Sequence, residues 1–254
     1  MSLAQYFRST NVFRFLKYGI KDSWGYVRLG DYLDLPRLIL LWRTLPYSQQ
    51  NYASLSNVYD LTHRLESENI PGAVVECGVC LGGCAAVMTS IVQHSNTPRN
   101  VWLFDSFAGM PEATVEDVGE SASILASGRM TGNLIAVGTN IATLDEVKDV
   151  FFKKLRLKNE RIHFVKGWFQ ETLPVTKVAI GQIGLLRVDG DWYASTKVCL
   201  EELYDNVVSG GYVVVDDYGY FPGCKKAVDE FFQSRGLHVT LHKVDYSRVY
   251  FRKP

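Results

Sequence analysis

From residue 71 onward the chain alternates short apolar runs with stretches of helical periodicity, and this alternation limits the fold more than any other feature. Each run ends in glycine or polar residues, as buried strands do. Strands separated by helices connect through right-handed crossovers, which places them in one parallel sheet with helices on both faces. The alternation therefore predicts an α/β protein with a doubly wound, mostly parallel sheet. The expected strands are GAVVECG (72–78), NVWLFDSF (100–107), RIHFVKGWF (161–169), IGLLRVDGD (183–191) and GGYVVVDDYG (210–219).

The segments between these runs predict helices, and the C-terminus predicts a pair of strands. Residues 82–95, GGCAAVMTSIVQHS, carry an apolar stripe at helical spacing. A second helical pattern extends from Trp192 to Val207, and Ser209–Gly211 is expected to close it. The runs HVTLHKV (238–244) and SRVYFRK (247–253) are expected to pair antiparallel at the sheet edge.

Two stretches do not follow this alternation. Residues 1–70 show helical periodicity, as in NVYDLTHRLES (57–67), and predict a helical N-terminal cap or a dimer arm. The aromatic, basic start of that stretch leaves a membrane-surface helix as a less favoured alternative. Residues 112–145 are acidic and then small and polar without a period, and a loop of that length is usually functional, so we expect a lid. The catalytic domain is expected to span residues 71–254.

The charge balance and the apolar content exclude some classes of partner. The 254 residues include 27 basic and 27 acidic side chains, so no overall basic field exists to hold a nucleic acid. No apolar run approaches the roughly 18 residues of a membrane span, and the N-terminus lacks a secretory signal. We therefore expect a cytoplasmic protein that binds a small molecule.

The five cysteines do not form a disulfide framework, because their number is odd and three of them fall within eight residues. Cys77, Cys80 and Cys84 read C-x2-C-x3-C, a spacing that could hold a metal or an iron–sulfur cluster. Because no fourth cysteine or histidine lies nearby, reduced thiols are the favoured interpretation.

Two strand ends indicate a cofactor that contains adenosine. The loop ECGVCLGG (76–83) follows the first strand and opens a helix, although its glycine spacing differs from that of dinucleotide binders. Asp105 ends the next strand, where an acidic side chain reaches ribose hydroxyls in nucleoside-binding folds. The alternative for Asp105 is a structural role in a turn or at a helix N-terminus.

Four carboxylates follow the last two parallel strands, namely Asp189, Asp191, Asp216 and Asp217. If the strands are neighbours, these groups converge, and two unit charges about 4 Å apart repel by roughly 4 kcal/mol at an effective dielectric near 20. A divalent cation would neutralise them, and oxygen ligands select magnesium or else manganese or calcium. A further carboxylate beside the ion could accept a proton. The alternative is that the first pair caps a helix and the second forms a turn.

Six segments of this chain, in order and with similar gaps, resemble the macrocin O-methyltransferase family. The resemblance implies a Rossmann-like class I methyltransferase fold, S-adenosylmethionine as methyl donor, a dependence on Mg²⁺, and methylation of sugar hydroxyls on macrolides and aminocoumarins. The segments, which cover residues 70 to about 235, are IPGAVVECGV, LFDSFAGMP, VKGWFQETLP, LLRVDGDWYAST, GGYVVVDDYG and GCKKAVDEF.

The resemblance also implies roles for individual residues. It assigns the metal to Asp189, Asp216 and Asp217, and general base catalysis to Asp191, although some relatives are discussed with a histidine base that this sequence does not place. It assigns the cofactor to Glu76, Gly78 and Gly82 at its methionine end, Asp105 and Ser106 at its ribose, and Gly167, Trp168 and Phe169 near its adenine. Cys80, Cys84 and the long 112–145 segment depart from the pattern, and the segment leaves the acceptor open.

The function expected from the sequence is metal-dependent methyl transfer to a sugar hydroxyl of a small-molecule glycoside, a nucleotide sugar or a glycan. A catechol-type O-methyltransferase would share the fold, the cofactor and the acidic site. The DGD motif also resembles that of aspartyl-phosphate phosphatases, and a non-catalytic binding subunit is a further alternative. The N-terminal arm is compatible with a homo-oligomer.

Overall fold

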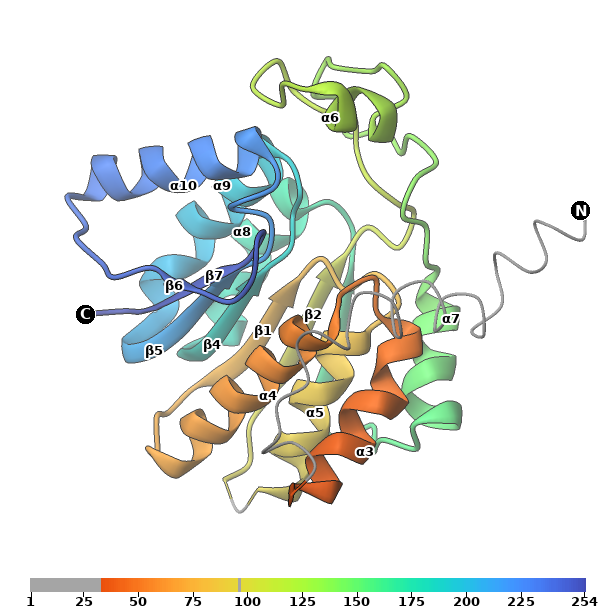
Figure 1. Cartoon of the computed structure of the whole chain (residues 1–254), viewed down its shortest axis with the longest axis vertical. Helices are drawn as coiled ribbons and strands as arrows, with labels where there is room; N and C mark the ends of the chain where they lie inside the picture. Colours follow the sequence, from red (N-terminus) through yellow and green to blue (C-terminus); the bar gives the residue numbers. More distant parts are fainter. Residues whose placement is uncertain (1–32, 96) are drawn as a thin grey trace, which may run out of the picture.

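The computed structural model describes residues 33–95 and 97–254, and its centre is a seven-stranded sheet (Figure 1). The strand order is β3-β2-β1-β4-β5-β7-β6, in which the first five strands are parallel and β7 pairs antiparallel with both β5 and β6. This order confirms the doubly wound sheet and its antiparallel C-terminal edge. The strands are β1 (Ala73–Cys77), β2 (Val101–Asp105), β3 (Ile162–Lys166), β4 (Ile183–Val188), β5 (Val207–Val215), β6 (His242–Lys243) and β7 (Val249–Arg252).

The register of the parallel strands brings their carboxyl ends to one edge. Cys77 at the end of β1 pairs with Phe104 of β2 on one side and with Val188 of β4 on the other. Val188 in turn pairs with Val215, the last residue of β5. The polar residues that follow each strand therefore meet at this edge, where ligands bind in doubly wound folds because the strand order reverses there.

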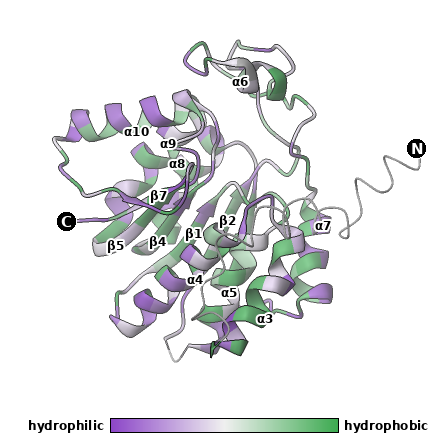
Figure 2. Cartoon of the chain, in the orientation of Figure 1, coloured by the Kyte–Doolittle hydropathy of each residue, from purple (hydrophilic) through white to green (hydrophobic). Residues whose placement is uncertain are grey.

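Helices cover both faces of the sheet, and their apolar sides face inward (Figures 1 and 2). The 3₁₀ turn η4 (Leu45–Tyr47) lies between α3 (Leu35–Thr44) and α4 (Tyr52–Ser67), the first two helices in the described part of the chain. One layer holds α3, α4, α5 (Gly83–His94), α7 (Leu144–Lys148) and the π-helical turn η5 (Asp149–Lys154). The other holds α8 (Phe169–Ile180), α9 (Tyr193–Leu203) and α10 (Pro222–Arg235). Across the described part of the chain, we find no helix with the length and apolar character needed to cross a membrane.

The described part of the predicted N-terminal cap packs as part of the main core. Asn51 starts α4 because its side chain accepts a hydrogen bond from the Ser54 amide at 3.1 Å, as an N-cap residue does. Leu61 and Leu65 of α4 are buried against α5 and the sheet, in the cluster that also contains Val74 and Leu185. The aromatic, basic start of the chain lies outside the described residues, and so does the surface helix considered for it.

One helix boundary differs from the prediction. Helix α9 ends at Leu203, a 3₁₀ turn η6 (Tyr204–Asn206) follows, and β5 already begins at Val207. Val207 fits the apolar helical spacing, but it pairs with Ile183 and is buried as a residue of β5. Its apolar character therefore reflects its place in the strand. Gly210 therefore lies inside a strand, with a φ of 81°, and does not close a helix.

The three crowded cysteines do not form a site. Cys77 lies in the core beneath α8 and α9, whereas Cys84 lies in the core on the opposite face of the sheet. All five cysteines are free. Within residues 33–95 and 97–254, the one cluster of potential metal ligands consists of aspartates alone, so the interpretation as reduced thiols is the one that fits.

The segment from 112 to 145 is largely irregular and stands apart from the two helical layers in Figure 1. Its one helix before α7 is the short α6 (Glu120–Leu125). Its base is fixed at two points, because Trp192 Nε1 donates to Pro111 O at 3.1 Å and the Tyr193 amide donates to Asp117 Oδ1 at 2.7 Å. A role as a lid stays a prediction.

Truncation of a buried leucine in α4 tests whether the cap belongs to the main folding unit. The Leu61 side chain is 1% exposed, so Leu61→Ala should lower the free energy of unfolding by about 2–5 kcal/mol. Leu35→Ala in α3 is the matched control, because Leu35 is 59% exposed and its loss should change stability by about 0.5 kcal/mol or less. Denaturant unfolding followed by circular dichroism measures both. A main transition unchanged by Leu61→Ala would show that the cap folds separately.

Candidate functional site

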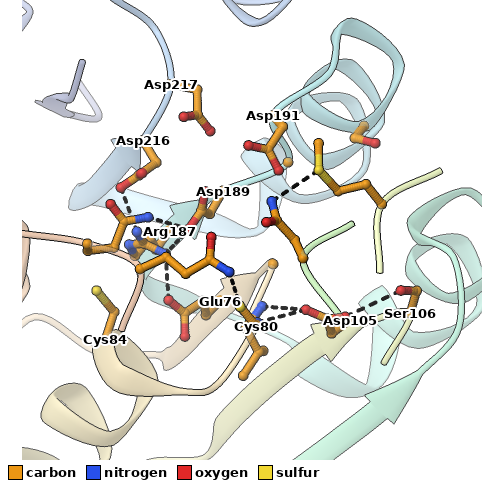
Figure 3. A pocket seen from close by; sticks show the side chains of 18 of the residues that line it. Glu76, Cys80, Cys84, Asp105, Ser106, Arg187, Asp189, Asp191, Asp216 and Asp217 are labelled. Carbon is orange, nitrogen blue, oxygen red and sulfur yellow. Dashed lines mark hydrogen bonds and ion pairs between the residues drawn. The ribbon is translucent and has the colours of Figure 1, made fainter. Parts of the chain in front are cut away.

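A cavity of about 410 Å³ opens at the carboxyl edge of the parallel strands (Figure 3). Its lining includes six carboxyl groups and two guanidinium groups from the described residues. Seven of the eight residues predicted to bind the cofactor line it, and Gly82 does not. All four aspartates predicted for metal binding and catalysis line it as well. The lining carboxyls are Glu76, Asp105, Asp189, Asp191, Asp216 and Asp217, and the guanidinium groups are those of Arg187 and Arg248.

The glycines of the loop after β1 allow close packing between backbone segments. Gly78 has a φ of 93°, and a Cβ atom there would lie 1.8 Å from the Asp189 carbonyl oxygen. Gly82 has a φ of 91°, and its Cβ would lie 2.6 Å from the Phe151 ring. Both positions therefore require glycine for reasons of packing, and their contact with a cofactor stays a prediction.

Asp105 ties the end of β2 to that loop. Its Oδ2 accepts hydrogen bonds from the amides of Val79 at 2.8 Å and Cys80 at 2.9 Å, and its Oδ1 accepts one from Phe107 at 2.7 Å. Ser106 completes the turn by donating to the Gly109 carbonyl at 2.7 Å. Burial raises the pKa of Asp105 in spite of these donors. The structural role considered for Asp105 is therefore present, and the carboxylate also lines the cavity, where a ribose contact stays a prediction.

Glu76, at the fourth position of β1, is buried beneath the loop. Its Oε1 accepts a hydrogen bond from Arg187 Nη1 at 2.7 Å, whereas its Oε2 is buried without a partner among residues 33–95 and 97–254. Burial raises the pKa of Glu76 to about 8, against the opposing effect of Arg187. A buried acceptor oxygen without a partner is costly, so Glu76 is a position at which a ligand donor would be stabilising.

Gly167 and Trp168 connect β3 to α8, which begins at Phe169, and the three residues lie on the far side of Asp105 from the aspartate cluster. The Gly167 amide donates to the Asp105 carbonyl at 3.0 Å, which joins the ends of β2 and β3. Trp168 precedes the first residue of α8, and all three residues line the cavity. This placement suits the expected adenine contact, which stays a prediction.

Three aspartates bring ligand atoms within 4.8 Å of one another, and they are Asp189, Asp191 and Asp217. Asp191 has a φ of 56°, and it does not cap α9, because Asp117 accepts the hydrogen bond from the first amide of that helix. Asp217 Oδ2 is buried without a partner in the described structure. Burial raises the pKa of all three carboxyls, and the charges of neighbouring aspartates, Asp216 among them, raise it further, so that the pKa values of Asp191 and Asp217 lie well above the usual range. The arrangement is costly without a cation, which is a property of metal sites.

Asp216, which the resemblance placed among the metal ligands, lines the same cavity but binds two guanidinium groups and is not part of that cluster. Its Oδ1 accepts hydrogen bonds from Arg187 Nη2 at 2.5 Å and from Arg248 Nε at 2.8 Å. The structure therefore groups Asp191, and not Asp216, with Asp189 and Asp217. Asp216 and Asp217 differ in this way because successive residues at the end of a strand point to opposite sides.

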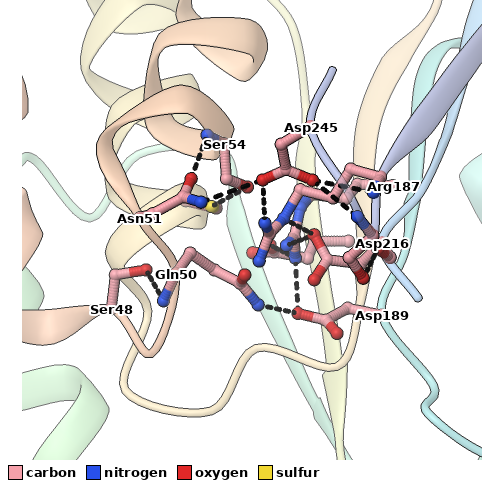
Figure 4. Close-up of polar contacts among 12 residues, drawn as sticks. Ser48, Gln50, Asn51, Ser54, Arg187, Asp189, Asp216 and Asp245 are labelled. Atoms are coloured by element: carbon pink, nitrogen blue, oxygen red, sulfur yellow. Dashed lines mark hydrogen bonds and ion pairs between the residues drawn. The ribbon is translucent and has the colours of Figure 1, made fainter. Parts of the chain in front are cut away.

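A buried network of ion pairs surrounds Asp216 (Figure 4). The sequence pattern did not predict it. Arg187 is 1% exposed and binds Glu76, Asp189 and Asp216 at 2.5–2.9 Å. Arg248 joins Asp216 to Asp245, and Asp245 Oδ2 accepts a hydrogen bond from Asn51 Nδ2 at 2.9 Å. The network therefore connects β1, β4, β5 and the segment before β7 to the N-terminus of α4. Arg187 is the one charged residue in an otherwise apolar run, and that signal could have identified it.

Gln50, in the loop before α4, was also missed, and no pattern in its surroundings could have identified it. Its Nε2 donates to Asp189 Oδ2 at 3.2 Å. Through Gln50, the cap therefore contributes a side chain to the lining of the cavity. The loop residues from Tyr47 to Gln49 line the cavity too.

Comparison with known proteins shows the family of the chain. The family model for macrocin-O-methyltransferase (TylF) matches residues 40–253. The chain belongs to the macrocin O-methyltransferase family. The resemblance found in the sequence is thereby confirmed, and so is the prediction that the protein is an O-methyltransferase.

Relatives in this family cover most of the chain. It is 34% identical over 213 residues to the demethyldecarbamoylnovobiocin O-methyltransferase of Streptomyces niveus, which covers 84% of this chain and 78% of the relative. It is 29% identical over 212 residues to a tetracenomycin 4'-O-methyltransferase of Streptomyces olivaceus, which covers 83% and 77%. Among solved structures, the O-methyltransferase NovP has a TM-score of 0.70 at 32% identity and covers 82% of each chain. The calicheamicin methyltransferase CalS11, at 20% identity and a TM-score of 0.62 over 99% of this chain and 93% of that one, shares the fold.

The position of Asp216 generates a prediction about stability. Asp216→Asn removes the charge that pairs with two buried guanidinium groups, and it should lower the free energy of unfolding by about 3–5 kcal/mol. Asp205→Asn is the matched control, because Asp205 is 65% exposed and its ion pair with Arg235 should contribute about 1 kcal/mol or less. Denaturant unfolding at neutral pH measures both variants. Equal effects would contradict the buried role of Asp216.

Proposed function

We propose that this O-methyltransferase transfers the methyl group of S-adenosylmethionine to a sugar hydroxyl with the help of a divalent cation. The observation that carries the proposal is the cluster of Asp189, Asp191 and Asp217, which lies beside the glycine loop in one cavity. The names of the relatives support a sugar acceptor, because one is named for a rhamnosyl derivative of tetracenomycin and another for 3''-O-methylation of mycinamicin III.

The described residues fit S-adenosylmethionine at the ends of β1, β2 and β3. Glu76 offers a buried carboxylate oxygen without a partner, and Asp105 and Trp168 line the cavity beyond it. The lining carries more carboxyl than guanidinium groups, which favours a cationic ligand. When bound, S-adenosylmethionine supplies a methyl group activated by the positive charge on its sulfur.

The same cavity fits a hard divalent cation at the ends of β4 and β5. Asp189 and Asp217 would hold the ion, since Mg²⁺ is commonly bound through one or two carboxylates and keeps positions for water and substrate. The partnerless Asp217 Oδ2 supports this assignment. When bound, such an ion orients hydroxyl groups and lowers their pKa.

Asp191 is placed to accept the proton that the acceptor hydroxyl loses during transfer. It lies within 4.8 Å of the other two carboxylates, and its left-handed backbone conformation is fixed by the turn between β4 and α9. Burial and the neighbouring Asp189 charge raise the pKa of Asp191, which makes its carboxylate a stronger base. Asp191 thus removes the proton while the cavity aligns the oxygen with the methyl group.

The charges of the cavity favour a neutral glycoside over a nucleotide sugar. The guanidinium groups in its described lining, Arg187 and Arg248, are both bound to carboxylates and nearly inaccessible. A diphosphate would therefore face six carboxyl groups. No guanidinium group in the described lining would be left to pair with it.

The variants Asp189→Asn and Asp191→Asn separate the two proposed roles. Asp189→Asn should strongly weaken Mg²⁺ binding and turnover, because a neutral amide oxygen attracts the ion less than a carboxylate does, while S-adenosylhomocysteine still binds. Asp191→Asn should keep Mg²⁺ binding and lose about 10²–10⁴-fold in turnover, the usual contribution of a general base. Calorimetry gives the Mg²⁺ affinity, and transfer of a labelled methyl group to the acceptors named for the relatives gives the rate.

Three results would each overturn one part of the proposal. Equal activity with and without a chelator would exclude the cation, and a joint loss of Mg²⁺ affinity and turnover in Asp191→Asn would make Asp191 a ligand. Methylation of catechol but of none of the glycosides would replace the sugar acceptor by an aromatic one.

A further inference from the structure

Gln50 enters the cavity from the cap and has a fixed amide orientation. Its Nε2 lies 3.2 Å from Asp189 Oδ2. A carboxylate only accepts hydrogen bonds, so the amide nitrogen must face Asp189 and the amide oxygen must point elsewhere. Two hydrogen bonds hold the backbone of the loop, because the Gln50 amide donates to Ser48 Oγ at 3.0 Å and the Ser54 amide donates to Asn51 Oδ1 at 3.1 Å (Figure 4).

Two acceptor oxygens near this point are buried without partners in the described part of the chain. One is Gln50 Oε1, and the other is Glu76 Oε2. Three consecutive contacts join the two side chains, from Gln50 to Asp189 at 3.2 Å, from Asp189 to Arg187 at 2.9 Å, and from Arg187 to Glu76 at 2.7 Å. Both residues line the cavity, where a bound donor group could satisfy both oxygens.

We propose that Gln50 Oε1 and Glu76 Oε2 together bind the α-ammonium group of the methyl donor. This inference rests on the proposal that S-adenosylmethionine is the donor. An ammonium group carries three hydrogen-bond donors and no acceptor, which matches two acceptor oxygens. Burial raises the pKa of Glu76 to about 8, and the positive charge of a bound ammonium group would favour the ionised carboxylate. The position fits as well, because β1 and β4 are adjacent and the pair lies where the cofactor side of the cavity meets the aspartate cluster.

The inference gives the cap a direct part in cofactor binding. The same amide group would touch the donor through its oxygen and Asp189 through its nitrogen. Gln50 would therefore position a proposed metal ligand relative to the amino-acid end of the cofactor. A cap that merely covered the core would not need a polar side chain at this place.

The test compares two ligands that differ in the amino-acid part of the cofactor. S-adenosylhomocysteine carries the α-ammonium, and 5′-methylthioadenosine lacks the whole amino-acid portion. Gln50→Leu should weaken S-adenosylhomocysteine binding about tenfold, which corresponds to roughly 1.4 kcal/mol, and should leave methylthioadenosine binding unchanged. Calorimetry on the full chain without added metal measures both dissociation constants. Gln233→Leu, on the exposed face of α10, is the matched control and should change neither.

Each outcome either supports or overturns the inference. An unchanged affinity of Gln50→Leu for S-adenosylhomocysteine would contradict it, and so would an equal loss for both ligands. Retained methylthioadenosine binding shows that the variant is folded, and Gln50→Asn, whose shorter amide should also weaken S-adenosylhomocysteine binding selectively, provides a second variant. If the unaltered protein bound neither ligand, the proposed methyl donor would be wrong, which is a different failure.

Discussion

The carboxyl edge of the sheet depends on the buried guanidinium of Arg187. It lies beside Glu76 in the β1–β4 register. It binds Glu76 in β1, Asp189 after β4 and Asp216 after β5. Without it, these carboxylates would meet in a place shielded from water, where their repulsion is strong. With Arg248, it also holds Asp216, while Asp189, Asp191 and Asp217 keep ligand atoms within 4.8 Å of one another. The chemistry proposed for the site follows from this arrangement, in which Asp189 belongs to the cluster and also pairs with Arg187, whereas Asp216 pairs with both guanidinium groups.

The strand order then divides the cavity into two parts. The ends of β1, β2 and β3 carry Glu76, Asp105 and the Gly167–Phe169 segment, which suit an elongated nucleoside cofactor. The ends of β4 and β5 carry the aspartate cluster, which suits a cation and the acceptor. Gln50 lies at the boundary, so the cap, the cofactor side and the cation side meet at one amide group.

The sequence predicted those features that follow from local pattern and from the geometry of parallel strands. The strand ends could be predicted because apolar runs that stop at polar residues expose those residues at one edge of a parallel sheet. The end of α9 was missed because Val207 satisfies both helical spacing and burial in β5. The position of Asp216 depends on two arginines distant in sequence, although the alternation of side chains already separates it from Asp217. Gln50 reaches the site through tertiary packing of the cap, which carries no local signal.

In the proposed site, a cation binds Asp189 and Asp217 while Arg187 and Arg248 retain Asp216. A crystal structure with S-adenosylhomocysteine and Mn²⁺ tests this most directly, because the anomalous signal of manganese locates the ion. We predict one peak in contact with carboxylate oxygens of Asp189 and Asp217, with the Asp216 carboxylate still hydrogen-bonded to both guanidinium groups. An ion coordinated by Asp216, with its contacts to Arg187 and Arg248 broken, would contradict it.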